Sequence, residues 1–413
     1  MHDVLPVDAP YWERIETAVR DCAREHSFLR IETPVLEFAN LYYKTTGEES
    51  DIVKKEMYIV RTKGGDVLAL RPEYTPGMCR SYLENALSRQ GQPQKLFSFG
   101  PVFRHDRPQL GRYRQFTQAE FNIIGGLNDP IYDAEIISMC ADFLSELKIK
   151  NFTLKLNSIG CRVCRPIYKR QLQSYYRNHE KELCGDCKRR LAENPLRLLD
   201  CKNESCEKLK EKAPNFLDKL CVTCSAHFKS VLEYLDEVRI TYVLDNHLVR
   251  GLDYYSRTVF EVFADGEEEH LGALAGGGRY DYLMETIGGR LTPAIGVASG
   301  AERLIAVMKA KEIVVSRKPQ KRIFLAHAGE PAKKKAFSLI KDLRAQGIMV
   351  VESLAKESLA AQLKVADKEK IGLALILGQK EIFEHSVIVR DLMAGAQETI
   401  PLEKLLGEIK KRL

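Results

Sequence analysis

Eight of the eleven cysteines lie between residues 161 and 224, and their spacing constrains the fold of this region more than any other feature of the chain. They form four close pairs: Cys161/Cys164, Cys184/Cys187, Cys201/Cys206 and Cys221/Cys224. A C-x2-C pair places two thiolates on one tetrahedral ion, and two pairs complete a four-thiolate shell. The spacing predicts structural zinc with these eight ligands. One ion with four spare thiols, or reduced thiols without metal, stay open as alternatives.

The segment that carries these cysteines, residues 161–236, is rich in Lys, Glu and Arg and has helical apolar spacing. It is predicted to be an inserted helical, zinc-binding domain. His227 is a spare ligand candidate, although a lone histidine is more often a surface residue. The three other cysteines are isolated in apolar-periodic stretches and are expected to be small buried hydrophobes: Cys22, Cys79 and Cys140.

The chain has no run of about 18 apolar residues, the length that spans a bilayer. Its first residues include Asp3, Asp8 and Glu13 and have no apolar core, so they are not expected to be a signal peptide. We therefore expect a cytoplasmic protein without a membrane partner, in which thiols rather than disulfides prevail. The net charge of +6 permits a phosphate-rich partner but does not require one.

The length of 413 residues suits two or three domains. Residues 1–160 and 237–311 mix strand and helix patterns and are predicted to form one domain around the insertion. Residues 312–322 are basic, contain Pro319 and are predicted to be a linker. Residues 323–413 alternate between strand-like and helix-like stretches, which predicts a separate α/β domain.

The segment most informative for chemistry is residues 103–126. Its arginines lie in or beside a loop between two strand-like runs, and guanidinium groups suit phosphate oxygens. Beyond the loop, Gln118, Glu120 and Asn122 alternate with apolar residues and share one face of a strand. This pattern indicates a polar-lined pocket, or else the solvated face of an edge strand.

FRHDRPQLGRYRQF, within this segment, resembles motif 2 of the class II aminoacyl-tRNA synthetases in its histidyl form. LVRGLDYYSRTVFEV at 248–262 resembles the histidine-specific motif of histidyl-tRNA synthetases, and AGGGRYDYLM at 275–284 resembles its partner motif. Three more segments resemble motif 1, the amino-acid-binding loop and motif 3 of that family: IETPVLE around Pro34, LRPEYTPG at 70–77 and GVASGAERL at 296–304. The six occur in the family's order.

This resemblance implies an α+β fold, with an antiparallel-sheet class II synthetase catalytic core flanked by helices. To that core it adds a helical cysteine-rich insertion and a C-terminal α/β anticodon-binding domain. It implies a homodimer formed through motif 1. The implied activity is that of a histidine–tRNA ligase, which activates histidine with ATP and transfers it to the 3′ end of its tRNA. Family membership does not supply the zinc, since many members lack these cysteines.

By resemblance, Arg104, Arg250 and Arg303 carry catalysis. Adenylate formation brings a carboxylate to the α-phosphorus of ATP, so cations must offset the repulsion between two anions. Arg104 and Arg250 are expected at the α-phosphate, and Arg303 against adenine. Asp106 is expected at the adenine edge. Mg²⁺ is expected on the phosphates, with Glu302 as a candidate ligand.

By resemblance, Glu73, Thr75 and Gln118 accept hydrogen bonds from the α-ammonium of histidine. Further histidine-binding candidates are Asn122, Arg250, Tyr254, Tyr255 and Tyr280. Asn122 departs from the family, which usually has Glu or Asp facing the imidazole. An amide oxygen accepts a ring N–H but brings no charge, so either Glu120 compensates or ring recognition differs.

Contacts with tRNA are expected from two regions. Arg107 and Arg112 are candidates for the acceptor stem, with bracing of the loop by ion pairs as the alternative. The insertion is expected to clamp tRNA near the acceptor end through basic residues whose alternative is a solvated helix face: Lys169, Arg170, Lys188, Arg189 and Arg190.

Two other functions are weighed against this one. The first is the histidyl-synthetase-like regulatory subunit of ATP phosphoribosyltransferase, which keeps the fold but lacks the anticodon domain and usually RGLDYY. The second is a class II synthetase for glycine, threonine or proline, which RGLDYYSRTVFE disfavours.

Overall fold

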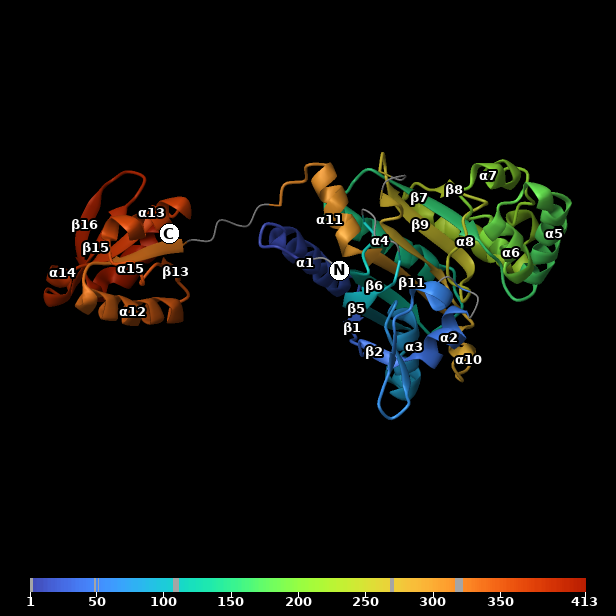
Figure 1. Ribbon diagram of the computed structural model, residues 1–413, viewed down its shortest axis with the longest axis horizontal. Coiled ribbons are helices and arrows are strands. Elements are labelled where there is room, and N and C mark those ends of the chain that lie inside the picture. The colour runs from blue at the N-terminus through green and yellow to red at the C-terminus, as the bar shows by residue number, and fades with distance from the viewer. Residues whose placement is uncertain (1–2, 48–49, 51, 107–110, 268–270, 316–321) are drawn as a thin grey trace. The chain divides into compact units, whose positions relative to one another are not determined.

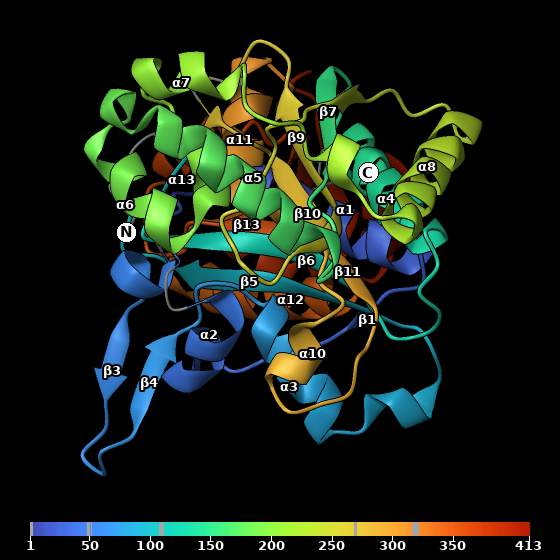
Figure 2. The same ribbon diagram turned by 90° about the vertical axis from the view of Figure 1, so that its right-hand side faces the viewer.

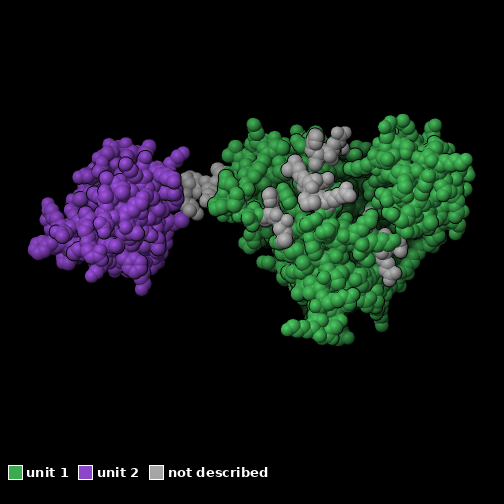
Figure 3. Space-filling view, viewed as in Figure 1, with its two compact units in different colours: residues 1–315 green, residues 316–413 purple. Residues whose placement is uncertain are grey.

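The computed structural model describes residues 3–47, 50, 52–106, 111–267, 271–315 and 322–413. It divides into two compact units, Met1–Val315 and Ser316–Leu413 (Figure 3). Each unit has its own hydrophobic core. Within the described residues, no helix is both long and apolar enough to cross a membrane.

An eight-stranded sheet organises the first unit, in the order β1-β5-β6-β11-β10-β9-β7-β8. All neighbouring strands are antiparallel except the outermost pairs, β1 with β5 and β7 with β8. The strands are β1 (Leu29–Arg30), β5 (Gln94–Phe103), β6 (Gln115–Ile124), β7 (Phe152–Ser158), β8 (Val243–Leu244), β9 (Ser256–Ala264), β10 (Ala275–Arg279) and β11 (Ala294–Gly300).

Helices cover one face of this sheet and form the main core with it. They are α1 (Ala9–Glu25), α4 (Ile131–Glu146), α8 (Val222–Glu237) and α11 (Ala301–Ala310). Ala119, Phe121 and Ile123 of β6 point into this core, as the alternation in the sequence predicts. Cys22 and Cys140 are buried here too, and Cys79 is buried in the neighbouring cluster, which confirms their predicted role as small hydrophobes.

Shorter elements surround the β5–β6 end of the opposite face, where Figure 2 shows α2, α3 and α10 together. A second, three-stranded antiparallel sheet, β2-β4-β3, extends from this region. The elements are β2 (Leu36–Phe38), α2 (Ala39–Thr46), η1 (Ile52–Glu56), β3 (Ile59–Arg61), β4 (Val67–Leu70), α3 (Thr75–Glu84), η2 (Leu87–Gln90) and α10 (Leu283–Thr286). The motif 1 segment, residues 31–37, therefore follows β1 and ends in β2, with Pro34 between the two strands.

The cysteine-rich segment is helical, and its first helices form one cluster in both ribbon views (Figures 1 and 2). Its elements are α5 (Cys164–Asn178), η3 (Glu180–Glu182), α6 (Gly185–Glu193), η4 (Pro195–Leu198), α7 (Glu204–Lys210), η5 (Leu217–Lys219) and α8. It belongs to the same compact unit as the sheet, so its status as a separate domain, residues 161–236, stays a prediction.

The second unit is a mixed five-stranded sheet, β13-β12-β14-β15-β16, with helical cores on both faces. The first three strands are parallel, and β15 and β16 are antiparallel additions. The elements are β12 (Arg322–His327), α12 (Glu330–Ala345), β13 (Met349–Glu352), α13 (Leu359–Lys368), β14 (Leu373–Leu377), α14 (Gln379–Phe383), β15 (Ser386–Asp391), β16 (Gln397–Pro401), η6 (Leu402–Lys404) and α15 (Leu405–Arg412).

Candidate active site

Two adjoining cavities lie on the sheet face opposite the main helical core. The larger has a volume of about 430 Å³ and the smaller about 40 Å³. Glu120 of β6, Ala298 of β11, Gly276 of β10 and Glu261 of β9 lie opposite one another across four neighbouring strands. All four line one or other cavity. The sheet is thus the common floor of both cavities.

Several guanidinium groups and carboxylates line the larger cavity. Arg104, Arg112, Arg250 and Arg303 all line it, together with Asp106 and Glu302. These residues come from the β5–β6 connection, the loop before β9 and the start of α11. Such a group of cations is typical of a site for phosphate groups. Every described residue that the sequence assigned to ATP therefore lies in one cavity.

Arg104 and Arg250 line both cavities and so stand at the boundary between them. The Arg104 side chain donates from Nε to the Pro72 carbonyl at 2.9 Å. Arg250 is ion-paired with Glu261, and its buried Nε has no hydrogen-bond partner among the described residues. These contacts hold each guanidinium while leaving donors for a ligand.

Arg303 is held by backbone carbonyls rather than by a carboxylate. Its Nε donates to the Gly111 carbonyl at 3.0 Å and its Nη1 to that of Ala273 at 2.7 Å. Burial, and then repulsion from Arg112 and Arg104, lowers the pKa of Arg303 to about 10. Burial and the neighbouring guanidinium groups both disfavour the charged form of Arg303, and an anionic ligand would stabilise that form.

Carboxylates and phenols line the smaller cavity. Its walls include seven of the eight residues that the sequence assigned to histidine: Glu73, Thr75, Gln118, Arg250, Tyr254, Tyr255 and Tyr280. Tyr254 donates to Glu73 Oε2 at 2.7 Å, and Thr46 donates to Oε1 at 3.2 Å. The buried Gln118 Oε1 has no partner among the described residues, so it offers an acceptor for a donor-rich ligand.

Both acidic groups of the smaller cavity hold their protons more tightly than usual. Burial raises the pKa of Glu120 to about 7, against the hydrogen bond from Thr75. Burial also raises the pKa of Glu73. A buried carboxylate without a cation is unfavourable, so a positively charged ligand would stabilise the ionised form of both groups.

Asn122 is buried behind the cavity wall, and it alone of the eight predicted histidine ligands does not line the cavity. Its Oδ1 accepts from Tyr280 at 2.5 Å, and its Nδ2 donates to Glu120 Oε1 at 3.1 Å. A Cβ on Gly296 would overlap its amide. Asn122 thus orients two residues of the cavity, and the acidic group that faces the cavity is Glu120.

Three further candidates are the motif 2 arginines Arg107 and Arg112, and Glu302 of α11. Arg112 Nη1 pairs with Asp106 Oδ2 at 3.3 Å, which matches the alternative of a braced loop. Arg107 lies outside the described residues. Glu302 accepts from the Thr117 backbone N–H with both carboxylate oxygens, at 2.9 and 3.0 Å. Burial raises the pKa of Glu302 to about 7.

The glycine run 276–278 forms strand β10, although a triple glycine is more typical of a turn. A Cβ at Gly276 would overlap the Arg250 guanidinium, and one at Gly277 would overlap the Gly296 carbonyl. Only glycine lets the Arg250 guanidinium lie flat against this strand. The run therefore fixes where the cation lies.

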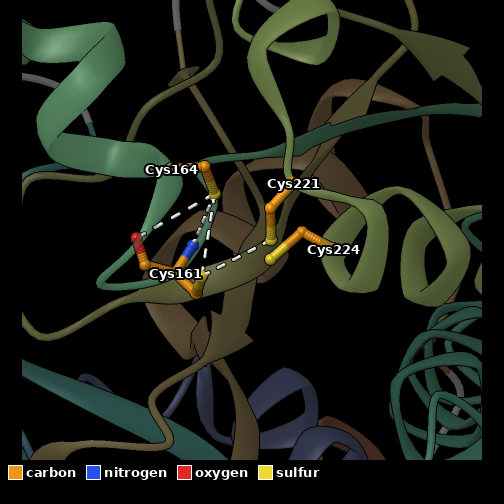
Figure 4. Close-up of side chains that lie close together, drawn as sticks. All are labelled: Cys161, Cys164, Cys221 and Cys224. Carbon is orange, nitrogen blue, oxygen red and sulfur yellow. Dashed lines mark hydrogen bonds between the residues drawn. The ribbon is translucent and has the colours of Figure 1, made fainter.

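The eight cysteines of the insertion converge into two separate groups. One is Cys161, Cys164, Cys221 and Cys224, and the other is Cys184, Cys187, Cys201 and Cys206. Within each group the sulfur atoms all lie within 4.8 Å of one another. Figure 4 shows the first group, in which the start of α5 meets the start of α8.

The sulfur spacings fit a tetrahedral ion. Four sulfurs at about 2.3 Å from zinc are about 3.8 Å apart. The distances are 3.7 Å for Cys161–Cys164, 3.8 Å for Cys161–Cys221 and 3.9 Å for Cys184–Cys201. These distances are too long for disulfides, and all eight thiols are free. The soft, all-thiolate donor set suits zinc.

His227 belongs to neither group and is not a surface residue. It is buried, and its Nε2 lies 3.1 Å from Asp133 Oδ1. Asp133 also accepts from Arg279 at 2.8 Å, so the three residues form a buried polar network between α8, α4 and β10. Burial of a pair of charges requires such partners.

The basic residues of the insertion are mostly at its surface. Arg170, Lys188 and Arg189 are exposed, whereas Lys169 and Arg190 are half-buried. Arg189 pairs with Asp186 at 2.8 Å. Arg197 and Asp200, which the sequence did not single out, line the larger cavity, as does Glu261. Only Glu261 had a signal in the sequence, because it alternates with the core residues Phe260 and Val262.

Comparison with known proteins agrees with this site. The family model "Histidyl-tRNA synthetase" matches residues 1–304, and "Anticodon binding domain" matches residues 313–412. A histidine–tRNA ligase of Dehalococcoides mccartyi is 45% identical over 413 residues, covering 100% of this chain and 98% of the relative. One from Desulforamulus reducens is 42% identical over 415 residues, with the same coverage.

A solved structure is similar over nearly the whole length. The apo histidyl-tRNA synthetase of S. aureus has a TM-score of 0.83 at 30% identity, covering 99% of this chain and 98% of that one. This likeness and the family matches confirm the predicted fold class. The match of residues 313–412 to an anticodon-binding domain favours the ligase over the regulatory subunit of ATP phosphoribosyltransferase. The chain belongs to the histidyl-tRNA synthetase family.

Proposed function

We propose that the two adjoining cavities carry the first step of histidine–tRNA ligation, with ATP in the larger and histidine in the smaller. The reaction follows from the family: the chain is a histidine–tRNA ligase, an aminoacyl-tRNA synthetase that uses ATP. The observation that carries the assignment of residues is that Arg104 and Arg250 line both cavities. The α-phosphate and the attacking carboxylate must meet at such a boundary.

In the first step a carboxylate oxygen of histidine attacks the α-phosphorus of ATP. The new bond is the acyl-phosphate bond of histidyl-adenylate, and the bond to the bridging oxygen breaks to release pyrophosphate. Arg104 and Arg250 offset the repulsion between the two anions and stabilise the charge that develops on the phosphorus oxygens. Arg303 stacks on adenine, and Asp106 lies at the adenine edge.

Histidine is recognised through its ammonium group and its ring. Glu73, Thr75 and Gln118 bind the ammonium, because each offers an oxygen to the same cavity. Tyr254, Tyr255 and Tyr280 enclose the imidazole. Glu120 takes the place of the acidic residue that the family usually has at position 122, and Asn122 holds Tyr280 and Glu120 in position.

In the second step a hydroxyl of the terminal tRNA ribose attacks the carbonyl carbon of the adenylate, and AMP leaves with the bond electrons. Arg107 and Arg112 are proposed contacts of the acceptor stem. The second unit would bind the anticodon, in keeping with the family model that matches it. The exposed lysines and arginines of the insertion are proposed phosphate contacts.

Class II synthetases use Mg²⁺ with ATP, and the ion supplies further neutralisation of the phosphate charge. Glu302 is the proposed protein ligand. Its carboxylate is a hard oxygen donor that lines the larger cavity, and it keeps lone pairs beyond those that Thr117 engages.

We further propose that each group of four cysteines holds one structural zinc ion. The converging sulfurs and the matching spacing support this, and the closed thiolate shell leaves no position for chemistry. Elemental analysis of protein purified without added chelator should give two zinc ions per chain. A folded, active preparation that contains no zinc would rule the ions out.

The homodimer and the cytoplasmic location are part of the same proposal. Apolar side chains are exposed along the motif 1 segment and the small sheet: Leu29, Leu36, Phe38, Ile59 and Val60. A second copy of the chain would cover them. Sedimentation should therefore give a dimer, and Phe38→Asp should shift it toward the monomer. A wild-type monomer at micromolar concentration would exclude this interface.

The decisive experiment is ATP–pyrophosphate exchange with each of the twenty amino acids. We expect exchange with histidine alone, since the smaller cavity combines ammonium acceptors with a ring-sized enclosure. Exchange with another amino acid, or with none, would refute the assignment of the cavities.

A further inference from the structure

The inserted segment contributes directly to the wall of the larger cavity. Of the described residues 161–236, Arg197 and Asp200 line that cavity beside Arg250, Gly251 and Leu252. The Arg197 side chain is only 17% exposed. A Cβ on Gly251 would lie 3.0 Å from Arg197 Nη1, so the absence of a side chain at 251 allows this guanidinium to reach the loop. A fifth guanidinium thus joins the four that face this cavity.

Arg197 lies in the segment between two cysteines of the second group. Arg197 lies in η4, between α6, which carries Cys187, and Cys201. Leu196, Leu198 and Leu199 around it are buried with these cysteines in one cluster. Asn194 donates to Asp253 Oδ1 at 2.8 Å and ties the same turn to the loop that follows Arg250.

We propose that Arg197 binds a phosphate group in the larger cavity, and that the metal ion held by the second cysteine group positions it there. This inference rests on the proposed function. The phosphate belongs either to ATP or to the 3′-terminal nucleotides of tRNA, because both must enter this cavity during the two steps. Arg197 pairs with Asp200 at 3.8 Å, and its planar fork of donors, which faces the same cavity as the arginines proposed for ATP, suits a phosphate.

The first test compares Arg197→Gln and Arg197→Lys with the wild-type chain. Arg20→Gln is the matched control, because Arg20 is an exposed arginine of α1 outside both cavities and pairs with Glu16 at 2.6 Å. Loss of a charge-assisted hydrogen bond should change binding by about 10- to 100-fold. Arg197→Lys should recover part of this loss, because it keeps the charge without the fork of donors.

Two assays separate the two sources of phosphate. If Arg197 binds ATP, Arg197→Gln raises the KM for ATP in pyrophosphate exchange and leaves the KM for histidine unchanged. If it binds the tRNA end, exchange stays normal, and single-turnover transfer from preformed adenylate slows. If both assays match Arg20→Gln, the inference is wrong. Histidine-dependent exchange by the wild-type chain shows whether the proposed function holds independently.

The second test asks whether the metal acts through Arg197. Cys201→Ser should lower the metal content from two ions to one and reproduce the kinetic defect of Arg197→Gln, and the double variant should be no worse than either single variant. Cys201→Ser should leave the KM for histidine unchanged, because no described residue of the insertion lines the smaller cavity. Additive defects, a raised KM for histidine, or a metal-free wild type would overturn the positioning role.

Discussion

The two cavities of the catalytic unit lie side by side on one sheet, yet different groups line them. Five arginines and five carboxylate residues line the larger, whereas the smaller contains Glu73 and Glu120 with three tyrosines and shares Arg104 and Arg250 with the larger. Burial, and then repulsion from neighbouring arginines, lowers the pKa of Arg303 in the larger cavity, and burial raises the pKa of Glu120 in the smaller.

This contrast teaches how a small site handles two reactants of opposite character. ATP would offset the repulsion that Arg303 meets from Arg112 and Arg104, and the histidine ammonium would stabilise the ionised form of the buried Glu120. Of the described charged residues, only Arg104 and Arg250 line both cavities, so we expect the reacting atoms to meet between them. Variants that remove charge from one cavity should therefore change the KM of one substrate. Variants at the boundary between the cavities should lower the rate of the chemical step.

The largest effect is expected at the boundary. Arg250→Ala should lower the rate of histidine-dependent pyrophosphate exchange by about 10²- to 10³-fold, because it removes charge stabilisation at the α-phosphate. The fold should persist, as judged by circular dichroism. Arg290→Ala, at an exposed residue outside both cavities, is the control. Exchange near the wild-type rate in Arg250→Ala would contradict its phosphate role.

The second-largest effect is expected on the free energy of unfolding, through the buried carboxylate of Glu120. The folded-state pKa of Glu120 is about 7 and its ordinary value is 4.5. This raised pKa means that its contribution to stability is complete below pH 4.5 and is lost as pH rises through 7. Over this window the loss is of the order of 3 kcal/mol. Glu120→Gln should abolish the part of the pH dependence of the free energy of unfolding that comes from Glu120.

Urea denaturation at pH 5 and pH 8 measures the Glu120 effect. The stability of Glu120→Gln relative to the wild type should increase from pH 5 to pH 8, and saturating histidine should oppose this change by pairing with the carboxylate. Glu237→Gln, at an exposed position on α8, serves as the control. An equal difference at both pH values would show that Glu120 does not titrate in this range.

A smaller effect is expected on the ammonium side. Glu73→Gln should raise the KM for histidine by about 10- to 100-fold, which is the range for loss of a charge-assisted hydrogen bond. The KM for ATP should change little, since Glu73 does not line the larger cavity. Steady-state exchange with each substrate varied in turn measures both constants. Equal increases in the KM for histidine and the KM for ATP would contradict the proposal that each cavity binds one substrate.

The smallest effect is expected at the rim. Arg112 is about half exposed and pairs with Asp106, and such a pair contributes about 0.2–1 kcal/mol. Arg112→Gln should therefore change the KM for ATP by less than about fivefold in exchange. A larger effect on transfer to tRNA than on exchange would support its contact with the acceptor stem, and a tenfold loss in exchange would place it among the ATP ligands instead.

Much of the fold follows from local sequence patterns. The alternation in β6 predicted which side chains face the core, because successive side chains of a strand point to opposite faces. The glycines of β10 gave the wrong local signal, since their place in a strand depends on Arg250 and on the neighbouring strand. β16 and α14 were not predicted, because their apolar patterns are short and only pairing and packing within the sheet define them.

The site was predictable where residues lie in characteristic motifs and unpredictable where distant segments meet. Glu73, Arg104 and Tyr280 could be assigned because each lies in a segment that resembles a family motif. The contribution of Arg197 could not, because it depends on how the insertion folds against the loop 250–253. The division of eight cysteines into two groups of four likewise required the tertiary structure, as spacing alone permits several combinations.

The first cysteine group has a consequence for the history of the chain. Cys161 and Cys221 bring their sulfurs to 3.8 Å, so the polypeptide between them starts after β7 and ends before α8 at a single point. A segment whose two ends coincide can be lengthened, shortened or exchanged for another without moving the strands on either side. The insertion could therefore be exchanged as a unit. Replacing it at this junction with a cysteine-free counterpart would measure how much of the activity depends on the insertion.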